Sequence, residues 1–379
     1  MNASAPRVCI IGGGIVGLAC AYELSKRNIR VTLLEYGKTG MQATNAAAGM
    51  LAALSEAHAP DAMLQAGMLA LHGYPRVVAE LQDSCGFGVE FRQDGILRVA
   101  FDEEDVETLH RQFAWQREMG LGVEWLDAAG CRELEPRLNE HVLGGVFSTA
   151  EATVSNQLIA LAFERGALAL GCEIEQGAPA TRFNRKGDRV KAAIAGGTAY
   201  EADLFVLAAG ARSGQIGKRM GIDVPVFPVR GQMIALGGMQ APVRRVVWGP
   251  DGYLVPRANG LVFAGATVEM VGFRRRTTQA GVRAMRSMAR RLIPQLAAAQ
   301  VHFEWAGLRP ATPDAYPIIG PAEGTNIVLA TGHYRNGILL GPISAHWIAR
   351  GIADGDWSAV PENFSPARFN EVHALTPNL

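Results

Sequence analysis

Residues 7–35 constrain the fold of this chain more than any other stretch, because a glycine-rich turn lies between a strand pattern and a helix pattern. Arg7–Ile11 is apolar and β-prone, and Gly12–Gly17 is the turn that follows it. Leu18–Asn28 has a helical pattern, and Arg30–Leu34 is a second apolar strand that leads to Glu35. This order predicts the first strand, turn, helix and strand of a doubly wound parallel sheet.

The glycines of this turn have separate physical roles. Gly12 permits the tight turn, Gly14 lets the backbone approach a pyrophosphate, and Gly17 allows the helix to pack closely on the strand. The N-terminus of the helix supplies free N–H groups and a positive dipole. We therefore predict a dinucleotide site that includes Ile15 and Val16, with a glycine-rich packing turn as the alternative.

Glu35 bears on the kind of dinucleotide. A carboxylate at the end of the second strand accepts hydrogen bonds from the free hydroxyls of an adenosine ribose. This favours FAD or NAD over NADP, and the residues alone leave these two open.

Length and charge limit the architecture and the partners. At 379 residues, the chain exceeds the length at which a single core stops growing, so we expect two interleaved domains. Lysine plus arginine and aspartate plus glutamate balance at 36 each. This balance gives no electrostatic reason to expect nucleic acid or an anionic membrane as a partner. We expect a small substrate.

We expect a cytoplasmic protein without a membrane segment. Val8–Leu24 is mostly apolar, but its three consecutive glycines and Glu23 fit the nucleotide turn better than a signal peptide. The cysteines have no CxxC or paired spacing, which indicates reduced thiols. They are Cys9, Cys20, Cys85, Cys131 and Cys172.

The expected fold class is α/β, with a Rossmann-type dinucleotide-binding domain interleaved with an antiparallel-sheet α+β substrate domain. Val89–Arg92 and Ile96–Val99 alternate around a turn and predict a β-hairpin that opens the second domain. Asp203–Gly210 is a continuous apolar run, typical of a buried parallel strand whose C-terminal end meets a ligand. The small residues 44–50 predict either a wall against a flat ligand or a plain helix start.

These patterns divide the chain into segments. We expect the dinucleotide-binding domain to comprise residues 1–85, 151–222 and 307–365. We expect the substrate domain to comprise residues 86–150 and 223–306. A helix is expected from about Pro342 to Ile352. Pro361–Leu379 is rich in Pro and Asn and predicts a loose tail, of which residues 366–379 lie outside both domains.

Four motifs occur in an order that resembles the D-amino acid oxidase family of flavoproteins, and most closely its glycine oxidase branch. They are the turn Gly12–Gly17, the run Ala208-Ala209-Gly210, the segment Trp305–Pro310 and the closing motif Gly332–Leu340. The likeness covers nearly the whole chain. It implies that the dinucleotide is FAD. Because no cysteine lies beside Arg309, where related sarcosine oxidases attach flavin covalently, the FAD is expected to be non-covalent.

The resemblance also implies three catalytic residues. Arg309 is expected to clamp the substrate carboxylate, because a guanidinium pairs bidentately with a carboxylate and stays charged. Tyr253 is expected to bond the same carboxylate and wall the pocket, and Arg335 to lie near substrate and flavin. A surface ion pair for Arg309 and a core position for Tyr253 are the alternatives. For His333 we favour a structural role over a catalytic one.

Matching positions imply a set of cofactor contacts, in which the closing motif offers N–H groups to the pyrimidine oxygen of the flavin. The set is Gly12, Gly14, Ile15, Val16, Gly17, Glu35, Thr44, Ala47, Ala48, Met50, Val154, Ala209, Gly210, Gly332, His333, Arg335, Asn336, Gly337, Ile338 and Leu339. No metal is expected. Arg230-Gly231-Gln232 resembles the segment that crosses between the domains. Val268 departs from the methionine of the glycine oxidases, which implies a larger pocket.

The activity implied is oxidative deamination of glycine or other small amines and D-amino acids, with hydride transfer to flavin N5. The partners are then a small amino acid or amine and molecular oxygen, and the products are an oxoacid, ammonia and hydrogen peroxide. The family role is to supply an imine for thiamin thiazole synthesis, and the family suggests a tetramer. The alternatives are a dehydrogenase with another electron acceptor, a flavin domain that acts on modified tRNA, and a flavin-binding module without turnover.

Overall fold

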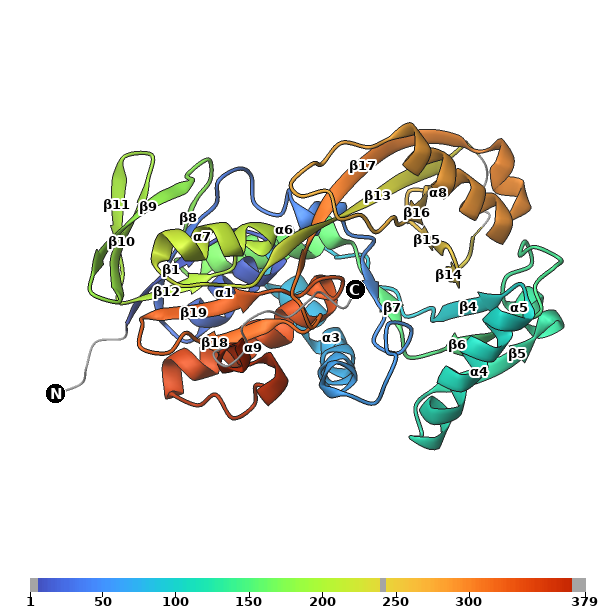
Figure 1. Cartoon of the computed structure of the whole chain (residues 1–379), viewed down its shortest axis with the longest axis horizontal. Coiled ribbons are helices and arrows are strands. Elements are labelled where there is room, and N and C mark those ends of the chain that lie inside the picture. Colours follow the sequence, from blue (N-terminus) through green and yellow to red (C-terminus); the bar gives the residue numbers. More distant parts are fainter. Residues whose placement is uncertain (1–5, 239–242, 370–379) are drawn as a thin grey trace.

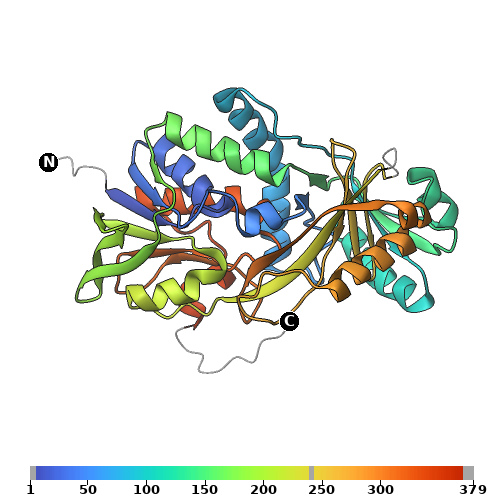
Figure 2. The same cartoon turned by 90° about the horizontal axis from the view of Figure 1, so that it is seen from above.

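The computed structural model describes residues 6–238 and 243–369. Figures 1 and 2 show two halves side by side along the long axis of the molecule, each built on its own sheet. The two longest strands, β13 and β17, run from one half into the other in Figure 1.

The first half is a six-stranded sheet in the order β18-β19-β12-β1-β2-β8. Its neighbours pair in parallel, except that β18 is antiparallel to β19. The strands are β1 (Arg7–Ile11), β2 (Arg30–Leu34), β8 (Glu173–Glu175), β12 (Leu204–Leu207), β18 (Ile318–Pro321) and β19 (Ile327–Thr331). Such a sheet, with a glycine-rich turn after its first strand, is the Rossmann-type arrangement predicted from residues 7–35.

Different elements cover the two faces of this sheet. The helices α1 (Ile15–Lys26), α3 (Ala62–Cys85), α6 (Asn156–Ala169) and α9 (Gly337–Asp354) form one core with Val8 and Ile10. Cys9 and Ile11 point to the other face, because side chains alternate along a strand. That face is covered by β9 (Ala180–Lys186), β10 (Arg189–Ala195), β11 (Thr198–Glu201) and α7 (Ser213–Met220).

The second half is an eight-stranded sheet in the order β17-β13-β16-β15-β14-β4-β6-β5. It is antiparallel apart from the parallel pair β14–β4. The strands are β4 (Ile96–Ala100), β5 (Val123–Asp127), β6 (Gly144–Ser148), β13 (Phe227–Gly237), β14 (Val246–Gly249), β15 (Gly252–Pro256), β16 (Val262–Gly265) and β17 (Gln300–Ala311). The predicted domain division stays a prediction, and β17 passes its boundary at residue 307 without a break.

Helices α5 (Ala128–Leu134) and α8 (Gln279–Leu292) pack on one face of this second sheet. Helix α4 (Glu103–Glu118) packs against Ala100 and Val146 in a separate hydrophobic cluster. The short elements are α2 (Ala43–Ala46), β3 (Met50–Leu51), β7 (Ala152–Thr153) and the 3₁₀ turns at Gly210–Arg212, Pro294–Ala298, Glu362–Phe364 and Pro366–Phe369. In the part of the chain that the structure describes, no helix has the length and apolar character needed to cross a bilayer.

The predicted β-hairpin at Val89–Val99 is wrong. Ile96–Ala100 pairs with β6 and β14, which lie far away in the sequence, and not with residues 89–92. Glu90 has a φ of 52°, which interrupts an extended strand, and Arg92 forms only an isolated bridge with Thr153. Long-range pairing has therefore overridden a local alternation pattern.

Helix α9 begins at Gly337, before the predicted start at Pro342. Proline has no N–H to donate to the carbonyl four residues earlier, which is that of Ile338. The buried Tyr74 Oη donates to this carbonyl instead, at 3.1 Å. A partner from α3 thus satisfies the group that Pro342 leaves free, and the helix continues through the proline.

The predicted loose tail is wrong for residues 361–369, and residues 370–379 lie outside the described residues. Phe364 is fully buried and packs against Tyr316 and Trp347. Arg368 pairs with Asp314, with Nε and Oδ2 2.7 Å apart. The segment therefore belongs to the first half of the molecule.

We predict that Phe364→Ala lowers the free energy of unfolding by about 3–5 kcal/mol, because it removes a buried ring and leaves a cavity. Urea denaturation of the FAD-loaded protein measures the change. The matched control is Phe303→Ala, at a ring that is 62% exposed, which should change stability by less than about 0.5 kcal/mol. Equal stability of the two variants would contradict the packing described.

Candidate active site

A cavity of about 580 Å³ lies between the two sheets. Its walls reach from the glycine turn before α1 to Tyr253 on β15 and Arg309 on β17. Most of the predicted site residues line it: Gly12, Gly14, Ile15, Val16, Glu35, Thr44, Ala47, Ala48, Met50, Tyr253, Ala209, Gly210, Arg309, His333, Arg335, Asn336, Gly337 and Ile338. Gly17, Val154, Gly332 and Leu339 are not among the lining residues. One continuous space thus joins the predicted cofactor and substrate residues.

The glycine turn has the geometry predicted from its sequence. Gly12 has a φ of 113°, and a Cβ there would lie 2.4 Å from the carbonyl oxygen of Ala208. A Cβ at Gly17 would lie 2.0 Å from the Gly12 carbonyl oxygen. Gly17 therefore serves the packing of α1 on β1, which explains why it lies behind the cavity wall and not in it.

Glu35 and Thr44 hold the turn. The buried Glu35 accepts from Gly13 N at 2.8 Å and from Gly37 N at 2.9 Å. Thr44 Oγ1 accepts from Ile15 N at 2.9 Å. Gly14, the residue before α1, supplies no side-chain cap. The N-terminus of α1, where Thr44 takes only the first N–H group, lies beside a buried acid, and this arrangement fits the pyrophosphate and ribose of a dinucleotide.

Of the two possibilities predicted for residues 44–50, the structure has a helix start, at Ala43, and the wall against a flat ligand stays a prediction. Residues Ala43–Ala46 form the short helix α2, and Met50–Leu51 form β3. Trp305 Nε1 donates to the Ala46 carbonyl at 3.1 Å, and a Cβ at Gly307 would lie 2.4 Å from the Ala46 Cβ. Small side chains are therefore required here for β17 to approach this segment.

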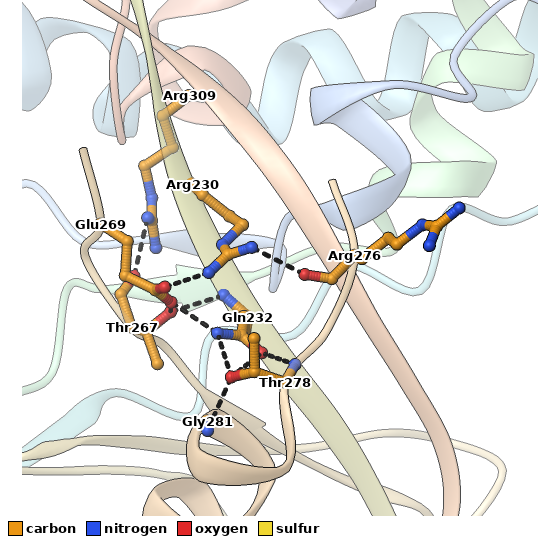
Figure 3. Close-up of polar contacts among 8 residues, drawn as sticks. All are labelled: Arg230, Gln232, Thr267, Glu269, Arg276, Thr278, Gly281 and Arg309. Atoms are coloured by element: carbon orange, nitrogen blue, oxygen red, sulfur yellow. Dashed lines mark hydrogen bonds and ion pairs between the residues drawn. The ribbon is translucent and has the colours of Figure 1, made fainter. Parts of the chain in front are cut away.

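Arg309 points from β17 toward the loop after β16. Its Nη1 donates to the Thr267 carbonyl at 3.0 Å, as Figure 3 shows. The guanidinium lies over Gly231 on β13, where a Cβ would come within 2.3 Å of Nη1. Among the ion pairs of the described residues, none includes Arg309. The alternative of a surface ion pair is therefore not supported.

Tyr253 lies beside this guanidinium. The side chain is 7% exposed, and its ring meets that of Trp248 edge-on at 5.2 Å. Burial raises the pKa of Tyr253, and the charges of Arg309 and Arg335 offset only part of this rise. The phenol therefore stays protonated and can donate a hydrogen bond to an anion.

Arg335 differs from Arg309 because it has a carboxylate partner within the chain. Its Nε lies 2.8 Å from Glu56 Oε2, and its guanidinium lies 5.6 Å from the ring centre of Trp248. Both Glu56 and Arg335 line the cavity. Their charges balance each other there.

Sequence reasoning missed Glu56, Trp248 and Thr267. Glu56 follows the small-residue run without a motif of its own. Trp248 stands opposite Tyr253 in the β14–β15 pair, so only the strand register reveals it. Thr267 contributes its backbone carbonyl, which no side-chain pattern can indicate.

Val268 lies outside the walls of this cavity, and its predicted effect on pocket size stays a prediction. It is 52% exposed and is not one of the lining residues. None of the five cysteines, all of which lie in the described part of the chain, lines the cavity either. Over residues 6–238 and 243–369, no cluster of three or more His, Cys, Asp or Glu side chains is placed to hold a metal.

Comparison with known proteins identifies the class to which this fold and cavity belong. Residues 7–350 match the family described as FAD dependent oxidoreductase, abbreviated DAO, and the chain belongs to this family. The predicted fold class, the family resemblance and FAD as the cofactor are thereby confirmed.

Curated relatives and a solved structure place the chain more narrowly. It is 33% identical to the glycine oxidase of Bacillus licheniformis over 341 residues, which are 90% of this chain and 91% of that protein. It is 36% identical to the bifunctional protein ThiO/ThiG of Synechocystis over 96% of this chain, but spans only 54% of that protein. The crystal structure of the glycine oxidase from Geobacillus kaustophilus superimposes with a TM-score of 0.91 at 28% identity, covering 100% of both chains.

His333 yields a prediction about acid stability. Its Nε2 lies 3.0 Å from Ser344 Oγ, and burial lowers its pKa from 6.5 to about 4. Between pH 6.5 and 4 the unfolded chain binds the proton more readily than the folded chain, so His333 makes stability fall as pH falls through this window. His333→Gln should flatten the slope of Tm against pH between 6.5 and 4.

The comparison is made by thermal unfolding of the FAD-loaded proteins. His302→Gln, at an exposed histidine, is the matched control and should keep the slope of the parent chain. A His333→Gln slope equal to the parent slope would mean that His333 does not titrate as its burial requires.

Proposed function

We propose that this chain is a glycine oxidase-like enzyme, which oxidises glycine and related small amines with FAD and oxygen. One observation carries the proposal: a guanidinium without a carboxylate partner, Arg309, faces the same cavity as the dinucleotide turn. The glycine oxidases among its relatives support this substrate class.

The cavity offers separate positions for the parts of FAD. The N-terminus of α1 would hold the pyrophosphate and Glu35 the ribose, as the family pattern implies. Residues 333–338 and the small-residue run 44–50 would border the flavin. Helix α9 begins there at Gly337, and Asn336 before it makes no side-chain cap. Its N–H groups and positive dipole favour negative charge on the bound ring.

Arg309 and Tyr253 then orient the substrate. Arg309 pairs with its carboxylate and Tyr253 donates to the same group, which fixes the α-carbon relative to the ring. Arg335 stays paired with Glu56 and borders the substrate. Bound FAD supplies the acceptor for the hydride that leaves the α-carbon of the neutral amine. The resulting imino acid is hydrolysed to an oxoacid and ammonia, and oxygen is reduced to hydrogen peroxide.

This reaction scheme requires no general base from the protein. His333 is buried and bonded to Ser344, and Glu56 is engaged by Arg335. These contacts support the structural role predicted for His333 and make Glu56 the partner of Arg335. The predicted supply of an imine for thiamin thiazole synthesis is supported by the ThiO/ThiG relatives. The cytoplasmic location and the tetramer stay predictions.

We predict that glycine bleaches the flavin absorbance when it is mixed with the yellow protein without air. Sarcosine, D-alanine and L-alanine are tested in parallel, and air is then admitted for a peroxide assay. Bleaching with prompt peroxide supports the oxidase. Bleaching without peroxide would favour a dehydrogenase with another acceptor, and no bleaching by any of the four would reject the proposed substrate class.

We predict that Arg309→Ala loses roughly 2–5 kcal/mol of carboxylate pairing. This corresponds to about a 30- to 4,000-fold lower kcat/KM for glycine. Initial rates of oxygen consumption measure it. Arg286→Ala, at an exposed arginine on α8, is the control and should keep the parent value. A loss below about threefold would remove Arg309 from the site.

A further inference from the structure

A polar cluster behind Arg309 joins β13, the loop after β16 and the start of α8 (Figure 3). Glu269 lies at its centre. It accepts from Thr267 Oγ1 at 2.5 Å and from Gln232 Nε2 at 2.6 Å, and it pairs with Arg230. Gln232 and Arg230 are buried, at 2% and 6% exposed. We call Arg230, Gln232, Thr267, Glu269 and Thr278 the Glu269 cluster.

The cluster fixes the backbone of the loop at Thr267. Gln232 N donates to Thr267 Oγ1 at 2.9 Å, so this hydroxyl links β13 to Glu269. Glu269 N donates to the Arg230 carbonyl at 3.0 Å, and Arg230 N donates back to Glu269 O at 2.9 Å. Thr267 is therefore held through its side chain and through the neighbouring backbone.

The same cluster is anchored to a helix. Gln232 Oε1 accepts from Thr278 N at 2.6 Å, and Thr278 Oγ1 caps α8 by accepting from Gly281 N at 3.1 Å. A Cβ at Gly281 would lie 2.5 Å from Gln232 Oε1, so the close contact requires this glycine. The loop can therefore shift only if α8 and β13 shift with it.

Charge within the cluster is balanced without Arg309. Burial raises the pKa of Glu269, but hydrogen bonds from Arg230, Thr267 and Gln232 outweigh it and lower the pKa overall. Glu269 is thus an anion that compensates Arg230. Arg309 donates to the neutral carbonyl of Thr267, which orients the guanidinium and leaves its charge uncompensated.

We propose that Glu269 is a positioning residue for substrate binding, which holds the Thr267 carbonyl so that Arg309 presents its guanidinium to the substrate carboxylate. This inference rests on the proposed function, since it assumes that Arg309 binds a carboxylate. Glu269 touches neither substrate nor cofactor in this scheme. It is not among the residues that line the cavity.

Two variants test the proposal in different ways. Glu269→Gln removes the anion and places an amide donor among the donors of Arg230 and Gln232. Thr267→Val keeps the Glu269–Arg230 ion pair and removes only the hydroxyl that ties the loop to Glu269, so it serves if Glu269→Gln does not fold. Glu304→Gln is the matched control: Glu304 is an exposed carboxylate on the same strand as Arg309, and it accepts from Thr277 at 2.8 Å.

The probe is acetate, a carboxylate with no amine to oxidise. Its binding to the FAD-loaded protein is measured from the change in flavin absorbance. We expect both variants to raise the Kd for acetate about two- to tenfold, the range for one lost hydrogen bond. The KM for glycine should rise with it, while the limiting rate of flavin reduction and the Kd for FAD change less. Glu304→Gln should match the parent chain in all four quantities.

The outcomes separate the two proposals. Wild-type affinity for acetate in Thr267→Val would overturn the positioning role and leave Glu269 only as the counter-charge of Arg230. A fall in Tm with unchanged Kd for acetate in both variants would also overturn it. If Arg309→Lys in the otherwise unchanged chain bound acetate as tightly as the parent, the proposed function of Arg309 would fail, and this inference with it.

Discussion

The register between β13 and β17 is the constraint on which the rest of the site depends. The two strands pair along the whole of β13, from Phe227 opposite Ala311 to Gly237 opposite Gln300. A slip of one residue would turn every side chain to the opposite face. This pairing places Gly231 beneath the Arg309 guanidinium. The same two strands join the halves of the molecule, so the cofactor and substrate ends of the cavity are aligned by one hydrogen-bonded ladder.

The three arginines near this ladder differ in whether a carboxylate of the chain compensates their charge. Arg230 is compensated by Glu269, and Arg335 by Glu56. A buried charge without a partner is costly, so uncompensated arginines are rarely left in such places. Arg309 is the exception among these three, because it has no carboxylate partner in the described part of the chain and donates to the carbonyl of Thr267. An anion that enters the cavity therefore meets one available positive charge of fixed direction among the three.

Local patterns predicted much of the fold because they act over short stretches. Arg7–Ile11 and Arg30–Leu34 are strands with the predicted bounds, since their apolar runs, glycine turn and acid all agree. The cavity-lining Arg309, Tyr253 and Arg335 came from a resemblance that covers the whole chain. Such motifs identify which residues belong to the site, and the fold brings these residues to one cavity.

Long-range contacts account for what sequence reasoning could not supply. The alternation at residues 89–99 is compatible with a hairpin, but β4 finds its partners at residues 144–148 and 246–249. Trp248 and Thr267 enter the site through strand pairing and a backbone carbonyl, and neither leaves a local pattern. Phe364 lies in a segment rich in proline, and its contacts with the distant rings of Tyr316 and Trp347 make it a core residue.

Pro342 and Tyr74 are distant in the sequence, but the effects of substitutions at the two positions are coupled. The proline leaves the Ile338 carbonyl without its helical donor, and the tyrosine hydroxyl of α3 replaces that donor. Exchange of Pro342 for alanine would restore an N–H that competes with Tyr74, while exchange of Tyr74 for phenylalanine would leave the carbonyl unsatisfied. The effects of the two exchanges are therefore not additive. A substitution at either position therefore has to be planned together with the other.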